Sequence, residues 1–188
     1  DFVTSICADE KNIIWIGTQN KGIYRYSLIT KTPENYKKNI LDKNSLSSNE
    51  ITSIYSDKKG VLWIGAIGGH LRKLDLQKKK IIHYHNKPYD KKSLSDDVIN
   101  VIYEDSKQQI WIGTVNGGLN KLNHKNAKIN FTSYTHNNSI YNSLNSKNIF
   151  SFCEDNFGNY WAGTANKGLN HMSFNEKQEI EQIRKYSK

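Results

Sequence analysis

Acidic and histidine side chains are the residues of this chain that could carry out acid–base or metal chemistry. Cleavage of a glycosidic bond needs two carboxylates facing the sugar, or a metal with a basic partner. The most regular acids are four aspartates, each of which precedes a tryptophan by six residues, and we assign both residue types to the fold. They are Asp9, Asp57, Asp105 and Asp155, followed by Trp15, Trp63, Trp111 and Trp161.

The remaining candidates for chemistry share no repeat position. His83 and His85 fall on one face of a predicted strand, which is at most a partial metal-binding pattern. We therefore predict no catalytic residue, no metal site and no cofactor. The scattered acids include Asp42, Glu50, Asp90, Asp96 and Asp97, and the histidines are His70, His83, His85, His124, His136 and His171.

Internal repetition settles the architecture. The four tryptophans are spaced by 48, 48 and 50 residues, and a glycine follows each of them by two positions. The segments around them read VTSICADEKNIIWIGT, ITSIYSDKKGVLWIGA, INVIYEDSKQQIWIGT and IFSFCEDNFGNYWAGT. Downstream of these come GIYRY, HLRKL, GLNKL and GLNHM, and then a tyrosine. One repeat unit thus occurs four times in the sequence.

Each unit holds four short runs with strand character, which in the second unit lie near 50–56, 61–66, 70–76 and 80–85. Four strands in a repeat of this length indicate one β-propeller blade per unit. No unit shows a helical apolar period, and solenoids of the β-helix or leucine-rich type need shorter repeats. We predict an all-β chain forming one propeller segment over 1–188, with blades at about 1–39, 49–87, 97–137 and 147–187.

The recurring residues make physical sense in a blade. An aspartate at the end of a first strand can accept backbone N–H bonds in the next turn, where Gly60 or Gly158 supplies a positive φ. Asn12 tolerates that backbone conformation, and Gln108 tolerates it less well. The tryptophan is large enough to fill the space between neighbouring sheets, and the glycine after it lets backbones approach closely.

A net charge of +9 raises the question of nucleic-acid binding. Only Arg25, Arg72 and Arg184 among the 27 basic residues are arginines, and the lysines are spread through every repeat. Arginine supplies most bidentate contacts to bases and phosphates. We therefore interpret the lysines as a solvated surface and predict no nucleic-acid partner.

The pattern over residues 57–74 and 105–122 resembles the two-component regulator propeller repeat. The resemblance implies a seven-bladed propeller, in the periplasmic sensor region of a hybrid histidine kinase from polysaccharide-using Gram-negative bacteria. It also implies a membrane span, a kinase and DNA-binding domains elsewhere in the protein, since this chain contains none of their motifs. His70 departs from the pattern, because the other units have Gly22, Gly118 and Gly168 there.

The ends and the cysteines leave several alternatives open. No apolar run is long enough to cross a membrane, and no leader precedes Asp1, so the chain is either soluble as made or lacks flanking segments. Four blades could close alone, belong to a larger ring, or pair with a second protomer through open edges. Cys7 and Cys153 could pair in an oxidising compartment, and two cysteines do not reveal the compartment.

Strand alternation places the second-to-third-strand loops and the long loops 37–49, 86–97 and 137–147 on one face. Propellers bind ligands where such loops converge, and loops on a rigid scaffold often carry function. Amides and lysines there can pair with sugar hydroxyls, uronates or sulfates, and tyrosines can stack on a pyranose. The predicted ligand-binding residues are Gln19, Asn20, Lys21, His70, Tyr89, Asn116, Tyr141, Asn166 and Lys167.

The function we predict is non-enzymatic sensing of a poly- or oligosaccharide by a periplasmic propeller segment. A protein–protein interaction scaffold is the first alternative, and a broad aromatic surface would favour it over convergent polar side chains. A propeller that hydrolyses or cleaves glycans is the second alternative.

Overall fold

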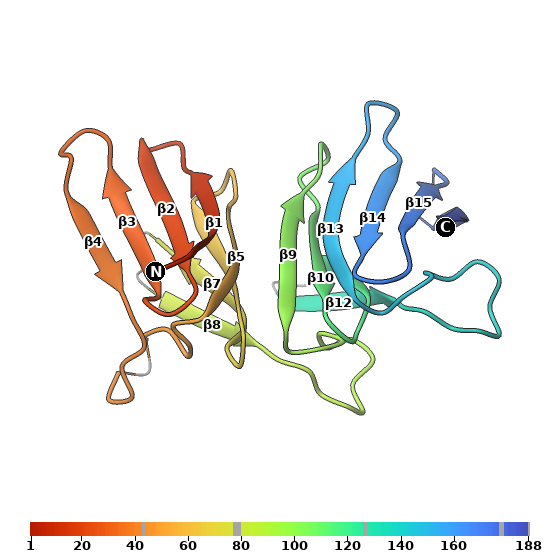
Figure 1. The fold of residues 1–188 in the computed structure, drawn as a ribbon, viewed down its shortest axis with the longest axis horizontal. Helices are drawn as coiled ribbons and strands as arrows, with labels where there is room; N and C mark the ends of the chain where they lie inside the picture. The colour runs from red at the N-terminus through yellow and green to blue at the C-terminus, as the bar shows by residue number, and fades with distance from the viewer. Residues whose placement is uncertain (43, 77–79, 126–127, 177–178, 188) are drawn as a thin grey trace. The chain divides into compact units, whose positions relative to one another are not determined.

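The computed structural model describes residues 1–42, 44–76, 80–125, 128–176 and 179–187, and the regular elements of this part of the chain are all β-strands. They form four antiparallel sheets of four strands each (Figure 1). The all-β propeller fold with four-stranded blades is therefore confirmed. In the second repeat, the four expected strands lie within one residue of their predicted limits.

The strands follow the chain order in each sheet, from the first strand at one edge to the fourth at the other. The first sheet contains β1 (Val3–Ala8), β2 (Ile13–Thr18), β3 (Ile23–Ser27) and β4 (Pro33–Tyr36). The second contains β5 (Ile51–Ser56), β6 (Val61–Ala66), β7 (His70–Asp75) and β8 (Lys80–Tyr84). The third contains β9 (Ile99–Glu104), β10 (Ile110–Thr114), β11 (Leu119–Lys125) and β12 (Lys128–Tyr134). The fourth contains β13 (Ile149–Glu154), β14 (Tyr160–Thr164), β15 (Leu169–Phe174) and β16 (Ile180–Tyr186).

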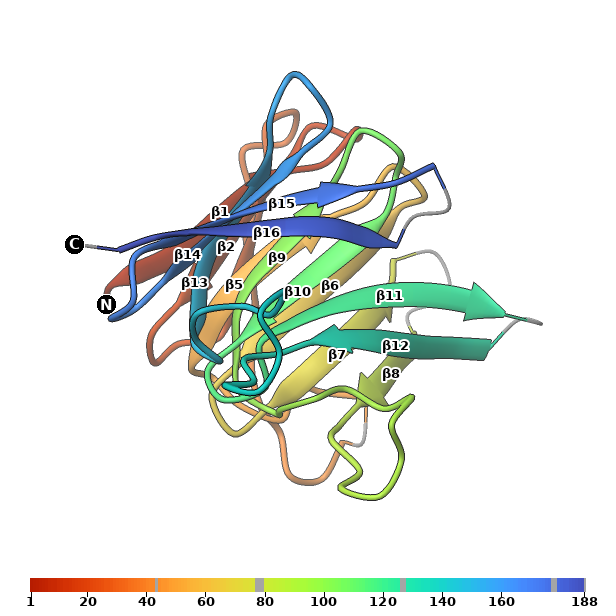
Figure 2. The same cartoon turned by 90° about the vertical axis from the view of Figure 1, so that its right-hand side faces the viewer.

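Contacts within the chain divide it into two compact units. The first unit comprises residues 1–85 and 97–102, and the second comprises 86–96 and 103–188, so the β9 strand contributes residues to both. In the second unit, β11 pairs with β12 and β15 pairs with β16. Figure 2 shows each pair as two strands side by side.

In the first unit, the first two sheets pack face to face. Trp15 and Ile13 on β2 are buried against Ile51 and Ile54 on β5, and Leu62 and Ile64 on β6 complete the same core. A Cβ atom on Gly17 would lie only 2.7 Å from Ile51 Cγ2, which explains the glycine after the tryptophan.

Polar bonds also join these two sheets. The Thr4 hydroxyl donates to the Ile51 carbonyl at 2.6 Å, and the Ile54 N–H donates to Ser5 Oγ at 2.9 Å. These two hydroxyl groups therefore join the blades by hydrogen bonds, in addition to the contacts of the apolar core.

In the second unit, aromatic side chains fill the space between the third and fourth sheets. The Trp111 ring lies 5.0 Å from the Tyr160 ring, 5.3 Å from the Phe152 ring and 5.7 Å from the Phe174 ring, between ring centroids. Tyr134 packs edge-on against Phe174 at 5.9 Å. The predicted role of tryptophan as filler between blades is thus confirmed within this unit.

The turn chemistry also agrees with the prediction. Asp9 Oδ1 accepts the backbone N–H groups of Lys11 and Ile13, and the other three aspartates make the same pair of bonds. The fourth turn position has a positive φ in every case, at 57° for Asn12, 75° for Gly60, 60° for Gln108 and 79° for Gly158.

Serine–leucine pairs close the long loops. Leu46, Leu94 and Leu144 are buried, and the serine before each donates to a carbonyl six residues upstream. The same serine hydroxyl accepts the backbone N–H of that upstream residue. The loops are consequently held at their base by these bonds.

Candidate functional site

The tryptophan–aspartate pairs are structural in this molecule. Each indole N–H donates to the second carboxylate oxygen of its own aspartate, at 3.1 Å from Trp15 to Asp9 and at 2.9 to 3.0 Å in the other three repeats. Since the first oxygen already holds the turn, one carboxylate ties the turn to the second strand. The bond from Trp161 and those from the turn lower the pKa of Asp155.

The predicted loop residues fall in both units. In the first unit, Gln19, Asn20 and Lys21 are exposed on the β2–β3 turn, where the Gln19 N–H donates to the Phe2 carbonyl at 3.0 Å. His70 begins β7 in the neighbouring sheet.

In the second unit, Tyr89 and Tyr141 are almost fully exposed on long loops. Asn116, Asn166 and Lys167 are exposed on the β10–β11 and β14–β15 turns. The Asn116 N–H donates to Asp96 Oδ2 at 2.8 Å. The structure thus assigns four of the nine predicted residues to the first unit and five to the second.

The start of β7 differs from the corresponding strand of every other repeat. His70 has a φ of 60°, and Gly22, Gly118 and Gly168 have φ values from 75° to 87° at this position. His70 therefore carries a side chain in a backbone conformation that favours glycine. Residues in such conformations are often connected with function.

A second departure lies two residues further on. Asn120 and Asn170 are buried and bond the loop before their blade, whereas the first and second repeats have Tyr24 and Arg72 at this position. The Arg72 guanidinium is buried and donates to the Ser45 carbonyl at 2.8 Å and to the Gly69 carbonyl at 3.3 Å. Burial lowers the pKa of Arg72 to about 10, so the group stays cationic near neutral pH.

Four basic side chains and one carboxylate gather around this strand. Arg72 pairs across the sheet with His83, and the His70 and His85 rings lie 6.1 Å apart between centroids. His70 Nδ1 lies 3.1 Å from Asp97 Oδ1 without hydrogen-bond geometry, so the contact is an ion pair when His70 is protonated. We call these residues, His70, Arg72, His83, His85 and Asp97, the histidine cluster.

The electrostatics of the histidine cluster favour an anionic guest. Partial burial lowers the pKa of His83, and the positive charges of Arg72, His70 and His85 lower it further. A bound anion would relieve this repulsion between like charges. Among the described residues, no three histidine, cysteine, aspartate or glutamate side chains are placed so that they could hold one metal ion.

Sequence reasoning identified only part of this cluster. His70 was recognised as a break in the repeat, but Arg72 was not, although HLRKL differs from GLNKL and GLNHM at both positions. The His83-x-His85 pattern was considered only for metal binding. The signal for an anion site was the coincidence of both departures with this histidine pair in one blade.

Comparison with known proteins agrees with the repeat and the fold. The two component regulator propeller family matches residues 1–20, 45–68, 93–116 and 143–166. The four repeats are two-component regulator propeller repeats. No curated protein matches the chain.

The solved structures that resemble the chain include two ectodomains of putative hybrid two component systems from B. thetaiotaomicron. The chain is 25% identical to the extracellular domain of BT3049 with a TM-score of 0.74, over 95% of this chain and 23% of that one. It is 26% identical to the extracellular domain of BT4673 with a TM-score of 0.72, over 96% of this chain and 24% of that one. The chain thus spans about a quarter of the length of these ectodomains.

A more distant structure supports the fold alone. The β-propeller domain of Cps50 (Swd1) from Myceliophteria thermophila is 13% identical, with a TM-score of 0.64, and the match covers 98% of this chain and 56% of that one.

The regulator repeats and the ectodomain likeness support a sensor or regulator role and agree with an extracytoplasmic location. The described residues form no helix that is both long and apolar enough to cross a bilayer.

Proposed function

We propose that this chain is a ligand-sensing, non-enzymatic segment of the periplasmic propeller region of a hybrid histidine kinase. In this proposal it recognises an acidic oligosaccharide through the histidine cluster. The observation that carries the proposal is that the second repeat has His70 where the other three have glycine, and Arg72 where the third and fourth have asparagine, beside His83 and His85. Uronate and sulfate groups are the sugar substituents that such cations pair with.

Exposed blade faces support the presence of further blades in the working protein. Ile6 is 63% exposed, whereas its counterparts Ile54, Ile102 and Phe152 are 4%, 6% and 7% exposed. At the other end of the chain, Trp161 is only half-buried, and the other three tryptophans are at most 2% exposed. A neighbouring blade on each terminal sheet would bury both side chains, as it does elsewhere in the repeat.

Signalling in this proposal requires two packing states of the propeller. A ligand shifts the balance between them only through different affinities for the two. The histidine cluster is suited to that task, because Arg72 bonds the carbonyl of Ser45 in the loop before its blade. An anion bound to the histidine cluster would alter the hydrogen bond from Arg72 that holds this loop.

An interaction scaffold is the second candidate. It is favoured by exposed apolar side chains on the terminal blades, such as Phe2, Ile29 and Phe150. Partner blades would cover part of this surface, so the sensor proposal accounts for both the histidine cluster and the apolar faces.

Titration calorimetry with sulfated, uronate-containing and neutral oligosaccharides tests the proposal. We expect acidic sugars to bind and neutral sugars to bind at least about tenfold more weakly, with affinity falling as salt rises. The His70→Gly variant restores the residue of the other repeats, and it should weaken acidic-sugar binding at least about tenfold. Lys107→Ala, which removes a positive charge from a turn in the other unit, is the control and should bind normally.

Two outcomes would reject the proposal. The first is that no acidic sugar binds at millimolar concentration. The second is that His70→Gly and Lys107→Ala bind as wild type does, which would show that the histidine cluster is not the site.

A further inference from the structure

The fourth strand of each sheet is an edge strand, whose outward backbone groups pair with no further strand of that sheet. One position on this edge has a different environment from blade to blade. It lies three residues before the tyrosine at the end of the strand, and the same position of the third strand faces it in every sheet. The four residues at this position are Pro33, Ile81, Phe131 and Ile183.

In the third and fourth blades, the loop before the blade bonds the outward N–H at this position. The Phe131 N–H donates to the Lys92 carbonyl at 2.9 Å. The Ile183 N–H donates to Asn142 Oδ1 at 2.6 Å, and Asn142 Nδ2 donates to the Glu181 carbonyl at 3.3 Å. A carbonyl oxygen therefore caps the edge in both blades, and in the fourth blade it belongs to a side-chain carboxamide.

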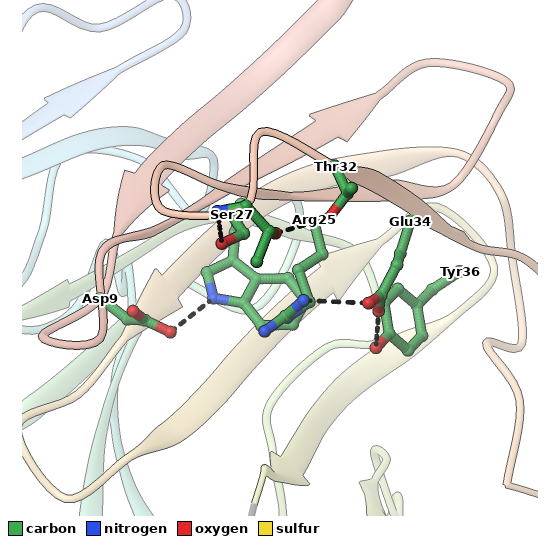
Figure 3. A network of polar contacts seen from close by, with 8 residues as sticks. Asp9, Arg25, Ser27, Thr32, Glu34 and Tyr36 are labelled. Carbon is green, nitrogen blue, oxygen red and sulfur yellow. Dashed lines mark hydrogen bonds and ion pairs between the residues drawn. The ribbon is translucent and has the colours of Figure 1, made fainter.

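The first blade needs no such cap, because Pro33 stands at this position of β4 and has no N–H. The next residue, Glu34, accepts hydrogen bonds from Arg25 Nη1 and from the Tyr36 hydroxyl, both at 3.1 Å, as Figure 3 shows. The edge strand of the first blade is thus held by its own side chains.

In the second blade, the Ile81 N–H points outward, since β7 and β8 pair in the same register as β11 and β12. Asn44 of the preceding loop stands at the capping position. The described residues of this loop make no hydrogen bond to Ile81. Ile81 and Asn44 both line a groove at the edge of this blade, together with the half-buried Leu74 and Leu76. An acceptor from a ligand can therefore take the place that the loop fills in the third and fourth blades.

This edge position lies next to the histidine cluster. Ile81 and His83 are alternate residues of β8, so their side chains lie on one face of the sheet, about 6.6 Å apart along the strand. Arg72 pairs with His83 across the sheet and donates to the Ser45 carbonyl, directly after Asn44. A backbone N–H donor and several cationic side chains are therefore within reach of one sugar residue.

We propose that the acidic sugar carries an N-acetyl group, whose carbonyl accepts the Ile81 N–H as Asn142 Oδ1 accepts that of Ile183. The acetamido group is a carboxamide like the asparagine side chain, so the fourth blade contains the model for this contact. Its methyl group contacts Leu74 and Leu76, and the sulfate or carboxylate of the sugar pairs with the histidine cluster. The inference rests on the proposed function, since it names the kind of sugar that the histidine cluster recognises.

Two monosaccharides that differ only in this group provide the test. They are N-acetylglucosamine 6-sulfate and glucose 6-sulfate, which has a hydroxyl in place of the acetamido group. Binding is measured by NMR titration of the isotope-labelled whole chain. We expect the N-acetyl sugar to bind at least about fivefold more tightly, because it gains one hydrogen bond and buries a methyl group. The amide signal of Ile81 should shift with the N-acetyl sugar and much less with glucose 6-sulfate.

Ile81→Pro removes the outward N–H and gives the second blade the residue type that the first blade has there. The ladder between β7 and β8 does not use this N–H, so the variant should fold and should bind glucose 6-sulfate as wild type does. It should bind the two sugars with equal affinity. Ile81→Val is the matched control, because it keeps the N–H and should keep the preference for the N-acetyl sugar.

Equal affinity of the wild type for the two sugars would overturn the inference, as would an N-acetyl preference that Ile81→Pro retains. If Ile81→Pro does not fold, the Ile81 amide signal of the wild type decides, and a signal that both sugars leave unshifted rejects the contact. If acidic oligosaccharides bind and the N-acetyl group gives no preference, the sensor proposal stands and this inference falls. Binding of no acidic sugar would reject both.

Discussion

The hydroxyl of Tyr160, on β14 of the fourth sheet, donates a 2.8 Å hydrogen bond to Asp105, which lies in the β9–β10 turn of the third sheet. The same oxygen accepts the Trp111 indole, and the other carboxylate oxygen holds the turn. One buried carboxylate therefore joins a turn, a strand and the next blade. Burial and the Asp105 carboxylate both raise the pKa of Tyr160, so this hydroxyl remains a donor throughout the physiological range.

Removing that hydroxyl should loosen the contact between the third and fourth blades. We expect Tyr160→Phe to lower the free energy of unfolding by about 1.5 to 3 kcal/mol, the range for losing a hydrogen bond to a charged group. Urea denaturation followed by tryptophan fluorescence measures the change. Tyr141→Phe is the control, because Tyr141 is 90% exposed, and it should leave the unfolding curve in place. Equal curves for the two variants would contradict the role assigned to Tyr160.

The bond between indole and carboxylate predicts coupling between two residues of one repeat. Asp57→Asn keeps an oxygen for the turn N–H groups but presents an amide N–H to the Trp63 indole. We expect it to destabilise the chain by about 1 to 3 kcal/mol, and to cost less in a Trp63→Phe background, where that donor is absent. A double-mutant cycle from urea denaturation measures the coupling. Strictly additive losses would show that the indole bond contributes nothing.

The two cysteines should differ in reactivity. Both are free thiols, with Cys153 exposed and Cys7 half-buried. Burial raises the pKa of Cys7 to about 11, and the negative charge of Asp9 adds to the effect. Because the thiolate is the nucleophile, iodoacetamide at about pH 8 should modify Cys153 first, with Cys7 reacting as the pH rises toward its pKa. Peptide mass spectrometry over time gives both rates, and faster labelling of Cys7 would contradict its burial.

Two isoleucines at one repeat position give a matched test of blade packing. Ile54 is buried against the first blade, and Ile6 is exposed on the free face of that blade. We expect Ile54→Ala to cost about 2 to 4 kcal/mol and Ile6→Ala less than about 0.5 kcal/mol. Denaturation of the two variants measures the difference. Similar losses would mean that something covers Ile6 in solution.

Much of the fold could be predicted from the sequence because its signals are local and repeated. The spacing of Trp15, Trp63, Trp111 and Trp161 gave the blade period, and the strand limits followed from the apolar runs around them. The positive φ at Asn12, Gly60, Gln108 and Gly158 could be predicted from turn chemistry alone. Each of these features depends on only a few neighbouring residues.

The candidate sites depended on contacts that a local pattern does not contain. Arg72 matters because its guanidinium reaches Ser45, which lies 27 residues away in sequence. Comparing the repeats residue by residue identifies His70 as a departure from the repeat. The contacts of His70 and Arg72 with other strands and loops come only from the structure.

The central claim is that the terminal sheets are blade faces that another blade or protomer normally covers. The mass of the chain in solution, measured by light scattering over a range of protein concentrations, tests this claim most directly. Exposed apolar faces of this kind promote association, so we expect a mass above 21.7 kDa that rises with concentration. A mass that stays at the monomer value at every concentration would contradict the claim.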